Sequence, residues 1–457
     1  MQSADLWFLY GAIQCRVSTR PHFATHLLLD LIEIASRINS GSGVHGISRC
    51  FGRSDKVITN RLARPGRRAI GNLENTRFPL TTPSSGDTLN RDYMPSVSAD
   101  ELRKLELTMR AAVIEAPGKI VTTEFPTPEP GPQDVLIKVF ASGICGTDVH
   151  IFDGDYVGSY PIIPGHEFSG IVDAVGGEVR RFRRGDRVAV EPNIACDNCA
   201  ACLNNRQNFC ENWQAVGVTR PGGMAEYVVA PEKAVFDIGP LSFSQGAFVE
   251  PLACVLHGVE RTHFHLADRV LIIGAGPIGN LLTRTIRLRG ACAITQVDRN
   301  QARLKLAREA GATETAVSLD GLPLDCYDVV VDATGVPELM QKTLSFARLG
   351  GTVLLFGVPP QTSTLTVDAF PIFRKGLTIR SSFTSVRNSL QAVRLLAGGA
   401  IDVTSLVSHT LALDDLGLGI DLMQTGHDGV LKVLIAPGGG GVRQTTDVSA
   451  AIAERRR

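Results

Sequence analysis

Three side chains of the kinds that bind a catalytic metal lie within one short stretch of this chain. Cys145 supplies a thiol, and His166 and Glu167 supply an imidazole and a carboxylate. A catalytic zinc uses these ligand types when its fourth position stays open for water or substrate. Thr147 and His150 add a hydroxyl and a second imidazole beside the thiol. We therefore predict a catalytic metal here, although the spacing alone also fits a buried cysteine and a loop histidine.

A second group of possible ligands consists of four cysteines in the pattern C-x2-C-x2-C-x7-C. Four thiolates at such spacing close a tetrahedral zinc site that has no open position, which is typical of structural zinc. An iron–sulfur cluster also takes four cysteines and is the lesser alternative. The neighbouring residues include Asp197, Asn198 and Asn204, so the stretch cannot be an apolar core. The predicted structural zinc ligands are Cys196, Cys199, Cys202 and Cys210.

A glycine-rich turn indicates a dinucleotide site. Gly274-Ala-Gly276-Pro-Ile-Gly279 follows the apolar run Arg269–Ile273 and opens a predicted helix that continues to Arg289. Such glycines let the backbone approach a pyrophosphate, which binds at the helix N-terminus. Asp298 ends the next predicted strand, where a carboxylate would accept hydrogen bonds from a ribose and repel a 2′-phosphate. We predict NAD over NADP, a preference that Arg299 weakens slightly. The alternative to a dinucleotide site is that the glycine-rich turn has a purely structural role.

The predicted secondary structure around these residues changes along the chain. From Met109 onward, short β-rich runs alternate with Pro and Gly turns, which predicts a β-barrel-like domain that carries the metal residues on its loops. After Glu250, strands and helices alternate, which predicts a doubly wound parallel sheet. Glu250 lies at the junction and is another candidate ligand or substrate contact. Its alternative role is a carboxylate at a helix N-terminus, where the helix dipole favours it. We predict a catalytic domain at 109–254 and 385–437 and a nucleotide-binding domain at 255–384.

The bulk composition excludes some function classes. The 457 residues include 46 Lys and Arg and 46 Asp and Glu, so the net charge of zero gives no electrostatic case for nucleic acid or an anionic membrane. No apolar run approaches the length of a membrane span. The six cysteines outside the group of four are scattered, which favours a reducing compartment such as the cytoplasm.

The two ends of the chain differ from its middle. Residues 1–108 are rich in Arg, Ser, Asn and Gly, and we predict a disordered extension there. Organelle targeting by this extension is the alternative, although acidic residues are unusual in such peptides. Residues 438–457 begin with four glycines and end with three arginines, and we predict a flexible tail.

Together these motifs resemble the zinc-containing medium-chain alcohol dehydrogenases, most closely their sorbitol (polyol) dehydrogenase branch. The resemblance covers about 109–436 and rests on Gly143–His150, Gly165–Phe168, the four cysteines, Val249–Leu252 and Gly274–Gly279. It implies an α/β protein with a GroES-like β-barrel catalytic domain and a Rossmann coenzyme domain.

The resemblance also implies roles for individual residues. Cys145, His166 and Glu167 match the catalytic zinc ligands, and Glu250 matches a carboxylate near the metal. Thr147 and His150 match a proton relay, and Asp148 matches an acid that orients the zinc-bound histidine. The positions that match cofactor contacts are Gly274, Gly276, Ile278, Gly279, Asp298, Arg303, Gly357, Val358 and Phe383.

Two departures from the sorbitol type bear on the substrate. Ile151 stands where that type usually has Tyr, and Thr384 and Ser385 stand where it usually has an Arg-Tyr pair. Those side chains grip polyol hydroxyls, so their replacement puts sorbitol itself in doubt. It leaves room for arabitol, a phosphorylated polyol, butanediol or threonine.

We predict an NAD- and zinc-dependent dehydrogenase of a polyol or related secondary alcohol, which would work as a homo-oligomer (a dimer or tetramer) without nucleic-acid or membrane partners. L-Threonine 3-dehydrogenase and a polyol-phosphate dehydrogenase are the alternatives within the enzyme class. A non-catalytic nucleotide-binding protein is the alternative outside it.

Overall fold

The computed structural model describes residues 108–426 and 429–438. The predicted extension at 1–108 and tail at 438–457 lie outside the described residues, except for Thr108 and Gly438. Within the described ranges, no helix is long and apolar enough to cross a membrane.

The first lobe is built on a seven-stranded sheet, which buries alternate side chains of its central strand β3, among them Val135, Ile137 and Val139. The last strand, β17, pairs antiparallel with β3 through Leu434 and Gly143, so the end of the chain returns to complete this lobe. The sheet follows the order β16(Val407–Ala412), β17(Lys432–Ala436), β3(Asp134–Gly143), β4(Glu167–Val175), β5(Arg187–Val190) and β9(Val235–Asp237), and β8(Tyr227–Pro231) also pairs with β3.

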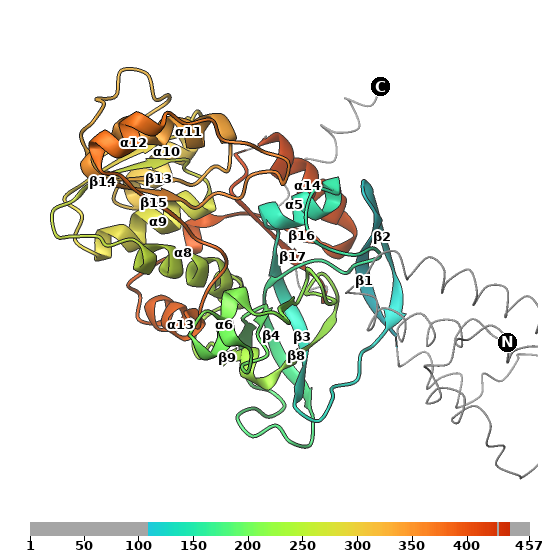
Figure 1. Cartoon of the computed structure of the whole chain (residues 1–457). Helices are drawn as coiled ribbons and strands as arrows, with labels where there is room; N and C mark the ends of the chain where they lie inside the picture. Colours follow the sequence, from blue (N-terminus) through green and yellow to red (C-terminus); the bar gives the residue numbers. More distant parts are fainter. Residues whose placement is uncertain (1–107, 427–428, 439–457) are drawn as a thin grey trace, which may run out of the picture. The chain divides into compact units, whose positions relative to one another are not determined.

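The second lobe contains a six-stranded sheet in which every strand pair is parallel. Its order is β12(Glu314–Ala316), β11(Ala293–Val297), β10(Arg269–Ile273), β13(Tyr327–Asp332), β14(Ala347–Leu355) and β15(Thr378–Ser381) (Figure 1). From β10 the chain adds strands outward on one side, through β11 to β12, and then crosses over to add β13, β14 and β15 on the other side of β10. Doubly wound sheets bind ligands at such a switch point, which lies here between β10 and β13.

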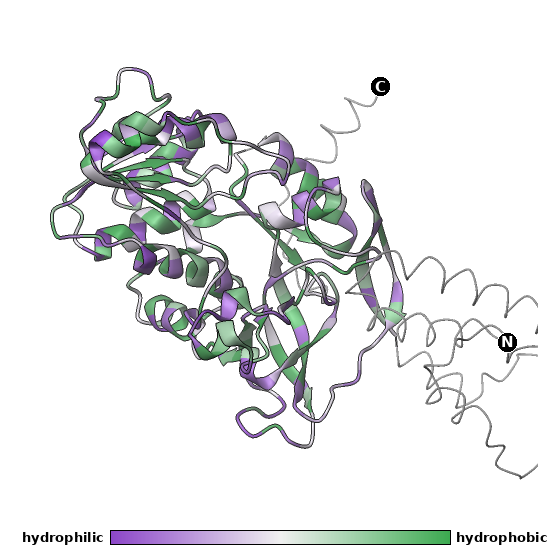
Figure 2. Ribbon diagram, viewed as in Figure 1, coloured by the Kyte–Doolittle hydropathy of each residue, from purple (hydrophilic) through white to green (hydrophobic). Residues whose placement is uncertain are grey.

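Helices cover both faces of the parallel sheet because its central strands bury apolar side chains on both sides. Figure 2 shows these strands largely in the green of hydrophobic residues. Val270 and Ile272 face a core shared with the helices α8(Val249–Arg261), α9(Pro277–Leu288), α10(Gln301–Glu309) and α13(Ser389–Ala397). Leu271 and Ile273 face the opposite core, which includes Phe346 of α11(Pro337–Phe346).

The predicted fold class, a β-barrel-like lobe joined to a doubly wound parallel sheet, is confirmed. The domain boundaries stay predictions, and the continuous helix α8 spans the one predicted at residue 254. The helix α11 ends at Phe346, because the chain continues directly into β14. Smaller elements are β1(Thr108–Ala116), β2(Lys119–Pro126), α5(Gly146–Asp153), β6(Asn193–Ile194), α6(Ala200–Leu203), η2(Gln207–Phe209), β7(Gln214–Ala215), η3(Glu232–Ala234), α7(Phe243–Gly246), α12(Ala369–Lys375), η4(Thr404–Leu406), η5(Leu413–Asp415) and α14(Leu416–Thr425).

Candidate active site

One buried carboxylate joins the two segments that carry the predicted catalytic ligands. Asp148 lies in the first turn of α5, whose N-cap is Cys145, and its side chain is fully buried. Its Oδ2 accepts a hydrogen bond from the backbone N–H of Cys145 at 2.8 Å, and its Oδ1 accepts one from the N–H of Gly165 at 3.1 Å. A charged acceptor makes strong hydrogen bonds to backbone N–H groups. Asp148 therefore fixes the start of α5 against the turn that leads into His166.

The structure brings the three predicted catalytic ligands together. One ligand atom each of Cys145, His166 and Glu167 lies within 4.8 Å of the others. The Nδ1 atom of His166 is buried without a hydrogen-bond partner and lies 3.6 Å from Oδ1 of Asp148. Metal-binding histidines commonly present one ring nitrogen to a carboxylate and the other to the metal. Burial works to lower the pKa of His166, but Asp148 and Cys145 outweigh it and raise that pKa well above its ordinary value.

A buried lysine, which the sequence analysis did not identify, contacts the same site. Lys432 Nζ lies 2.6 Å from Glu167 Oε2 and donates to the carbonyl of Ile144 at 3.1 Å. Burial works to lower the pKa of Lys432, but the carboxylate of Glu167 more than offsets it, so the pKa is raised. The carboxylate also requires Gly143, because a Cβ there would lie 2.3 Å from Glu167 Oε2. The only signal in the sequence was a lysine that opens the otherwise apolar strand β17.

A cavity of about 300 Å³ reaches these ligands and is lined by both lobes. Ten of the predicted site residues line it: Cys145, Thr147, His150, His166, Glu167, Glu250, Ile278, Gly357, Val358 and Phe383. The polar lining residues that sequence reasoning missed include Tyr156, Asn193, Trp213 and Cys254. No periodic or spacing signal marks these four.

A hydroxyl and an imidazole follow the metal ligand along α5. Thr147 and His150 both line the cavity. His150 is 22% exposed, and its Nδ1 lies 2.9 Å from Oδ1 of the half-exposed Asp155. His150 therefore connects the cavity to a partly exposed carboxylate, which suits the transfer of a proton toward solvent.

Glu250 also lines the cavity and lies in the first turn of α8. Its side chain is buried, and Oε1 accepts a hydrogen bond from the Cys254 thiol at 3.2 Å. Burial is the main cause that raises the pKa of Glu250 to about 7; the charge of Glu167 adds to this, and His166 opposes it.

The predicted nucleotide turn has the geometry that its glycines require. Gly274 has φ of 108°, and a Cβ on Gly279 would lie 2.1 Å from the Gly274 carbonyl oxygen. Gly276 is the N-cap of α9. The backbone angle at Gly274 and the close approach at Gly279 therefore both favour glycine. The N-terminus of α9 follows directly after the turn.

The two predicted polar cofactor contacts have protein partners. Asp298 Oδ2 accepts from the N–H of Ala275 in the glycine turn at 2.8 Å, so its carboxylate is fixed beside that turn. Its Oδ1 accepts from the N–H of Asn300 at 2.8 Å. Arg303 donates to the carbonyl of Val430 at 2.9 Å, and its cofactor contact stays a prediction.

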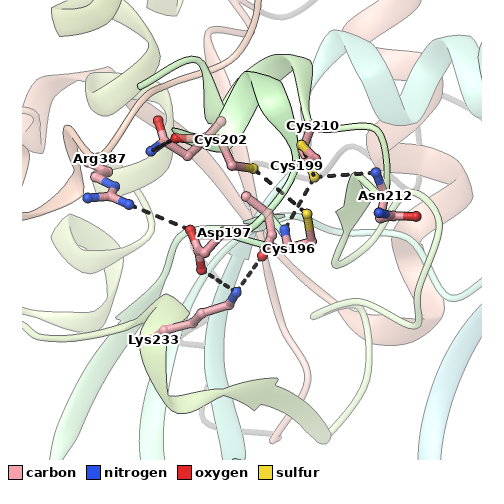
Figure 3. Close-up of polar contacts among 10 residues, drawn as sticks. Cys196, Asp197, Cys199, Cys202, Cys210, Asn212, Lys233 and Arg387 are labelled. Carbon is pink, nitrogen blue, oxygen red and sulfur yellow. Dashed lines mark hydrogen bonds and ion pairs between the residues drawn. The ribbon is translucent and has the colours of Figure 1, made fainter. Parts of the chain in front are cut away.

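The four predicted structural ligands also come together. We call residues 196–213 the cysteine lobe. One ligand atom of each of the four cysteines lies within 4.8 Å of the others, and the Cys196–Cys202 and Cys199–Cys210 sulfur pairs are each 4.0 Å apart. Zinc–sulfur bonds of about 2.3 Å would place tetrahedral ligands about 3.8 Å apart, so the sulfurs fit zinc closely. The N–H groups of Cys196 and Asn212 point at the Cys210 sulfur from 3.2 and 3.3 Å (Figure 3).

Asp197 ties the cysteine lobe to two other segments. Its carboxylate lies 2.6 Å from Lys233 Nζ and 3.5 Å from Arg387 Nη2 (Figure 3). The partners belong to η3 and to the segment that follows β15, so the cysteine lobe contacts both another part of the first lobe and a segment that follows the parallel sheet.

The two departures from the sorbitol type lie in different surroundings. Ile151 is 1% exposed in a core cluster with Ile114 and Ile162, and it is not among the residues that line the cavity. Thr384 lines the cavity, whereas the Ser385 hydroxyl donates to Glu191 at 2.6 Å. Position 384 is therefore the departure that faces a substrate directly.

Comparisons with known proteins agree with this geometry. Residues 131–240 match the alcohol dehydrogenase GroES-like domain, and residues 277–397 match the zinc-binding dehydrogenase domain. The chain is 35% identical to D-altritol 5-dehydrogenase from Agrobacterium fabrum, over 67% of this chain and 94% of that protein. It is 31% identical to D-arabinitol dehydrogenase 1 from Uromyces fabae (73% and 98%) and 34% identical to L-threonine 3-dehydrogenase from Alteromonas mediterranea (68% and 94%).

A solved structure gives the same result. A protein described as a zinc-binding dehydrogenase from Sinorhizobium meliloti 1021, bound to NADP, superposes with a TM-score of 0.68 at 37% identity. The superposition covers 72% of this chain and 99% of that one.

Proposed function

The chain belongs to the zinc-containing medium-chain alcohol dehydrogenase superfamily, in the branch of the polyol dehydrogenases, and from this premise we propose that it is an NAD-dependent dehydrogenase of a polyol or related secondary alcohol. The observation that carries the proposal is one cavity that is lined both by three side chains able to hold a metal ion and by residues of the nucleotide lobe.

The residues of this site fit a catalytic zinc. Cys145, His166 and Glu167 would hold the ion, because they supply a thiolate, an imidazole and a carboxylate within 4.8 Å of one another. When bound, zinc would polarise an alcohol oxygen and lower its pKa, as it does for water. Asp148 would keep the His166 ring oriented, and Lys432 would keep the Glu167 carboxylate in place.

The remaining cavity residues handle the substrate proton and the surroundings of the reacting carbon. Thr147 accepts the alcohol proton and passes it toward His150, whose partner Asp155 is half-exposed to solvent. Ile278, Gly357 and Val358 form the wall beside the site where the nicotinamide would accept the hydride. Both lobes enclose the cavity, which limits water at the reacting atoms.

The lining residues favour a neutral substrate. None of the described residues that line the cavity is a lysine or an arginine. A phosphate group or the carboxylate of threonine would therefore enter without a cationic partner, which is costly in a buried site. Hydroxyls of a polyol can bond to Thr384, whose buried Oγ1 has no partner in the described structure, and to Asn193 or Tyr156. The cavity thus supports polyols over phosphorylated polyols and threonine.

The cofactor preference rests on Asp298. Its carboxylate is fixed at the nucleotide turn and would repel the extra phosphate of NADP. Because a similar protein of known structure is bound to NADP, activity has to be measured with both NAD and NADP.

We also propose a cytoplasmic homo-oligomer. None of the cysteines in the described ranges forms a disulfide, which suits a reducing compartment. Strand β15 lies at the edge of its sheet, and Phe370 and Phe373 of the preceding helix are 70% and 80% exposed. An open strand edge beside exposed aromatic side chains suits pairing with a second copy. Light scattering of the protein and of a Phe373→Asp variant would test this; a wild-type monomer would contradict it.

A substrate panel tests the function. NADH absorbance would be followed with sorbitol, arabitol, altritol, butanediol, a polyol phosphate and threonine, and each would be repeated with NADP. We expect turnover with a neutral polyol and NAD. Turnover only with threonine or a phosphate would overturn the substrate proposal, and a protein that binds zinc and nucleotide but oxidises nothing would be the non-catalytic alternative.

A further inference from the structure

We propose that the cysteine lobe positions the wall of the substrate cavity, so that its metal-bound fold sets the affinity for the alcohol. The link is the segment Ser382–Ser389, which connects the parallel sheet to α13. Phe383 and Thr384 of this segment line the cavity. The inference rests on the proposed function and assigns this lobe a role beyond stability.

The first contact joins the lobe directly to the cavity wall. Asn208 of the lobe is 5% exposed, and its Nδ2 donates to the carbonyl oxygen of Phe383 at 3.0 Å. The Phe383 ring then lies against two aromatic rings of the lobe, with centroids 6.2 Å from Phe209 and 6.1 Å from Trp213. A partly buried hydrogen bond and two ring contacts therefore set both the backbone and the side chain of Phe383, which is otherwise 41% exposed.

A second contact reaches the segment through a buried carboxylate. Trp213 Nε1 donates to Asn193 Oδ1 at 3.1 Å, and Asn193 Nδ2 donates to Glu191 Oε1 at 2.6 Å. The other oxygen of Glu191 accepts from the hydroxyls of Ser385 and Ser389, each at 2.6 Å. A continuous chain of hydrogen bonds thus runs from the lobe to the far end of the segment.

The backbone of the segment needs such support. Thr384 and Arg387 have φ of 51° and 58°, in the left-handed region that costs energy for residues other than glycine. Arg387 is held by Asp197 of the lobe, and Thr384 follows the residue that Asn208 holds. Without these contacts, the segment would relax toward ordinary backbone angles. The Phe383 and Thr384 side chains would then move relative to the cavity.

The kinetic test removes one hydrogen-bond donor from the contact between the cysteine lobe and the Ser382–Ser389 segment. Asn208→Ala removes the donor to Phe383, and we expect the KM for the alcohol to rise about fivefold while the KM for NAD stays within about twofold. Asn208→Gln keeps an amide donor and should recover part of the loss. The matched control is Asn204→Ala, which removes an amide donor that bonds to the Ala200 carbonyl at 2.8 Å inside the lobe and makes no contact with the Ser382–Ser389 segment. It should leave both KM values unchanged.

A second readout does not depend on activity. The chain has two tryptophans, Trp7 and Trp213, so a Trp7→Phe background reports on Trp213 alone. Quenching of Trp213 by acrylamide should rise in Asn208→Ala and on removal of the lobe metal by a chelator, but not in Asn204→Ala. Phe383→Leu keeps the backbone bond and the lobe, and it should raise the alcohol KM by itself if Asn208→Ala fails to fold.

The outcomes separate the two proposals. Unchanged quenching and unchanged KM in Asn208→Ala would overturn the positioning role, as would equal effects in Asn204→Ala. If the wild-type protein oxidises no alcohol, the proposed function fails, and the quenching experiment alone still decides whether the lobe holds the segment.

Discussion

The two groups of metal ligands in the first lobe differ in how far apart their members lie in the sequence. The four cysteines lie within 15 residues, from Cys196 to Cys210, and every ligand is a thiol. Cys145, His166 and Glu167 belong to two separate segments, and their supporting partner Lys432 comes from the last strand. The closed site can form from one local stretch, whereas the open site needs most of the fold.

The difference follows from what each site has to do. A closed tetrahedral site satisfies its ion with its own ligands and can lie near the surface. An open site must keep one coordination position free and still limit water, so its ligands, of which His166 and Glu167 are buried here, need partners that fix them. Asp148 and Lys432, which are 0% and 4% exposed, are such partners. The comparison predicts that changes at the open site affect chemistry and global stability, and that changes at the closed site act locally.

The largest effect is expected from Cys145→Ala. Loss of one of three ligands should remove the catalytic metal and lower kcat/KM by at least about 10³-fold, since the metal supplies much of the stabilisation of the developing alkoxide. NAD binding should stay nearly intact, because the nucleotide turn lies in the other lobe. Stopped-time NADH assays and calorimetric titration with NAD would measure the two properties. Parallel loss of NAD binding would mean that Cys145 supports the fold instead.

The next largest effect is expected from Lys432→Met, and it concerns the free energy of unfolding and not turnover. The change leaves the buried Glu167 carboxylate without its cation, and breaking a buried pair in this way costs about 3–5 kcal/mol. Bound zinc would replace part of the lost positive charge, so the loss should be larger in metal-free protein than in zinc-loaded protein. Thermal unfolding with and without zinc measures both values. Equal losses in the two states would show that Lys432 does not act through the metal site.

The closed site should respond differently to the loss of a ligand. Cys199→Ser should lower the melting temperature by about 5 °C, because the affected segment is short and buries little of the core. The kcat at saturating alcohol should stay within about tenfold of the wild-type value at low temperature. Loss of turnover as complete as in Cys145→Ala would remove the distinction between the two sites.

The local motifs of this protein could be predicted from sequence, and the long-range contacts could not. The spacing of Cys196 and its three partners, the glycine turn at Gly274 and the apolar runs of the parallel sheet each carry their signal within a few residues. The fold class and family followed from them and are confirmed. The roles of the individual site residues stay predictions.

Lys432 and Asn208 show why the rest was missed. Lys432 contacts a residue 265 positions away, and Asn208 contacts one 175 positions away. Such partners are set by how the sheets close and by where one segment crosses another, and no periodicity in the sequence records that. A charged residue at the start of an apolar strand was the one available signal for Lys432.

The smallest effect is expected from Lys233→Met, which tests whether burial or distance makes the Lys432 pair important. Lys233 Nζ lies 2.6 Å from Asp197, the same distance as Lys432 Nζ from Glu167, but its side chain is 48% exposed and that of Asp197 is 45% exposed. Water already solvates an exposed pair, so the change should cost only about 0–1 kcal/mol and should shrink further as salt rises. Urea unfolding of both lysine variants at low and high salt measures the contrast. Because the two distances are equal, a loss at Lys233 as large as the loss at Lys432 would show that burial is not what separates the open site from the closed one.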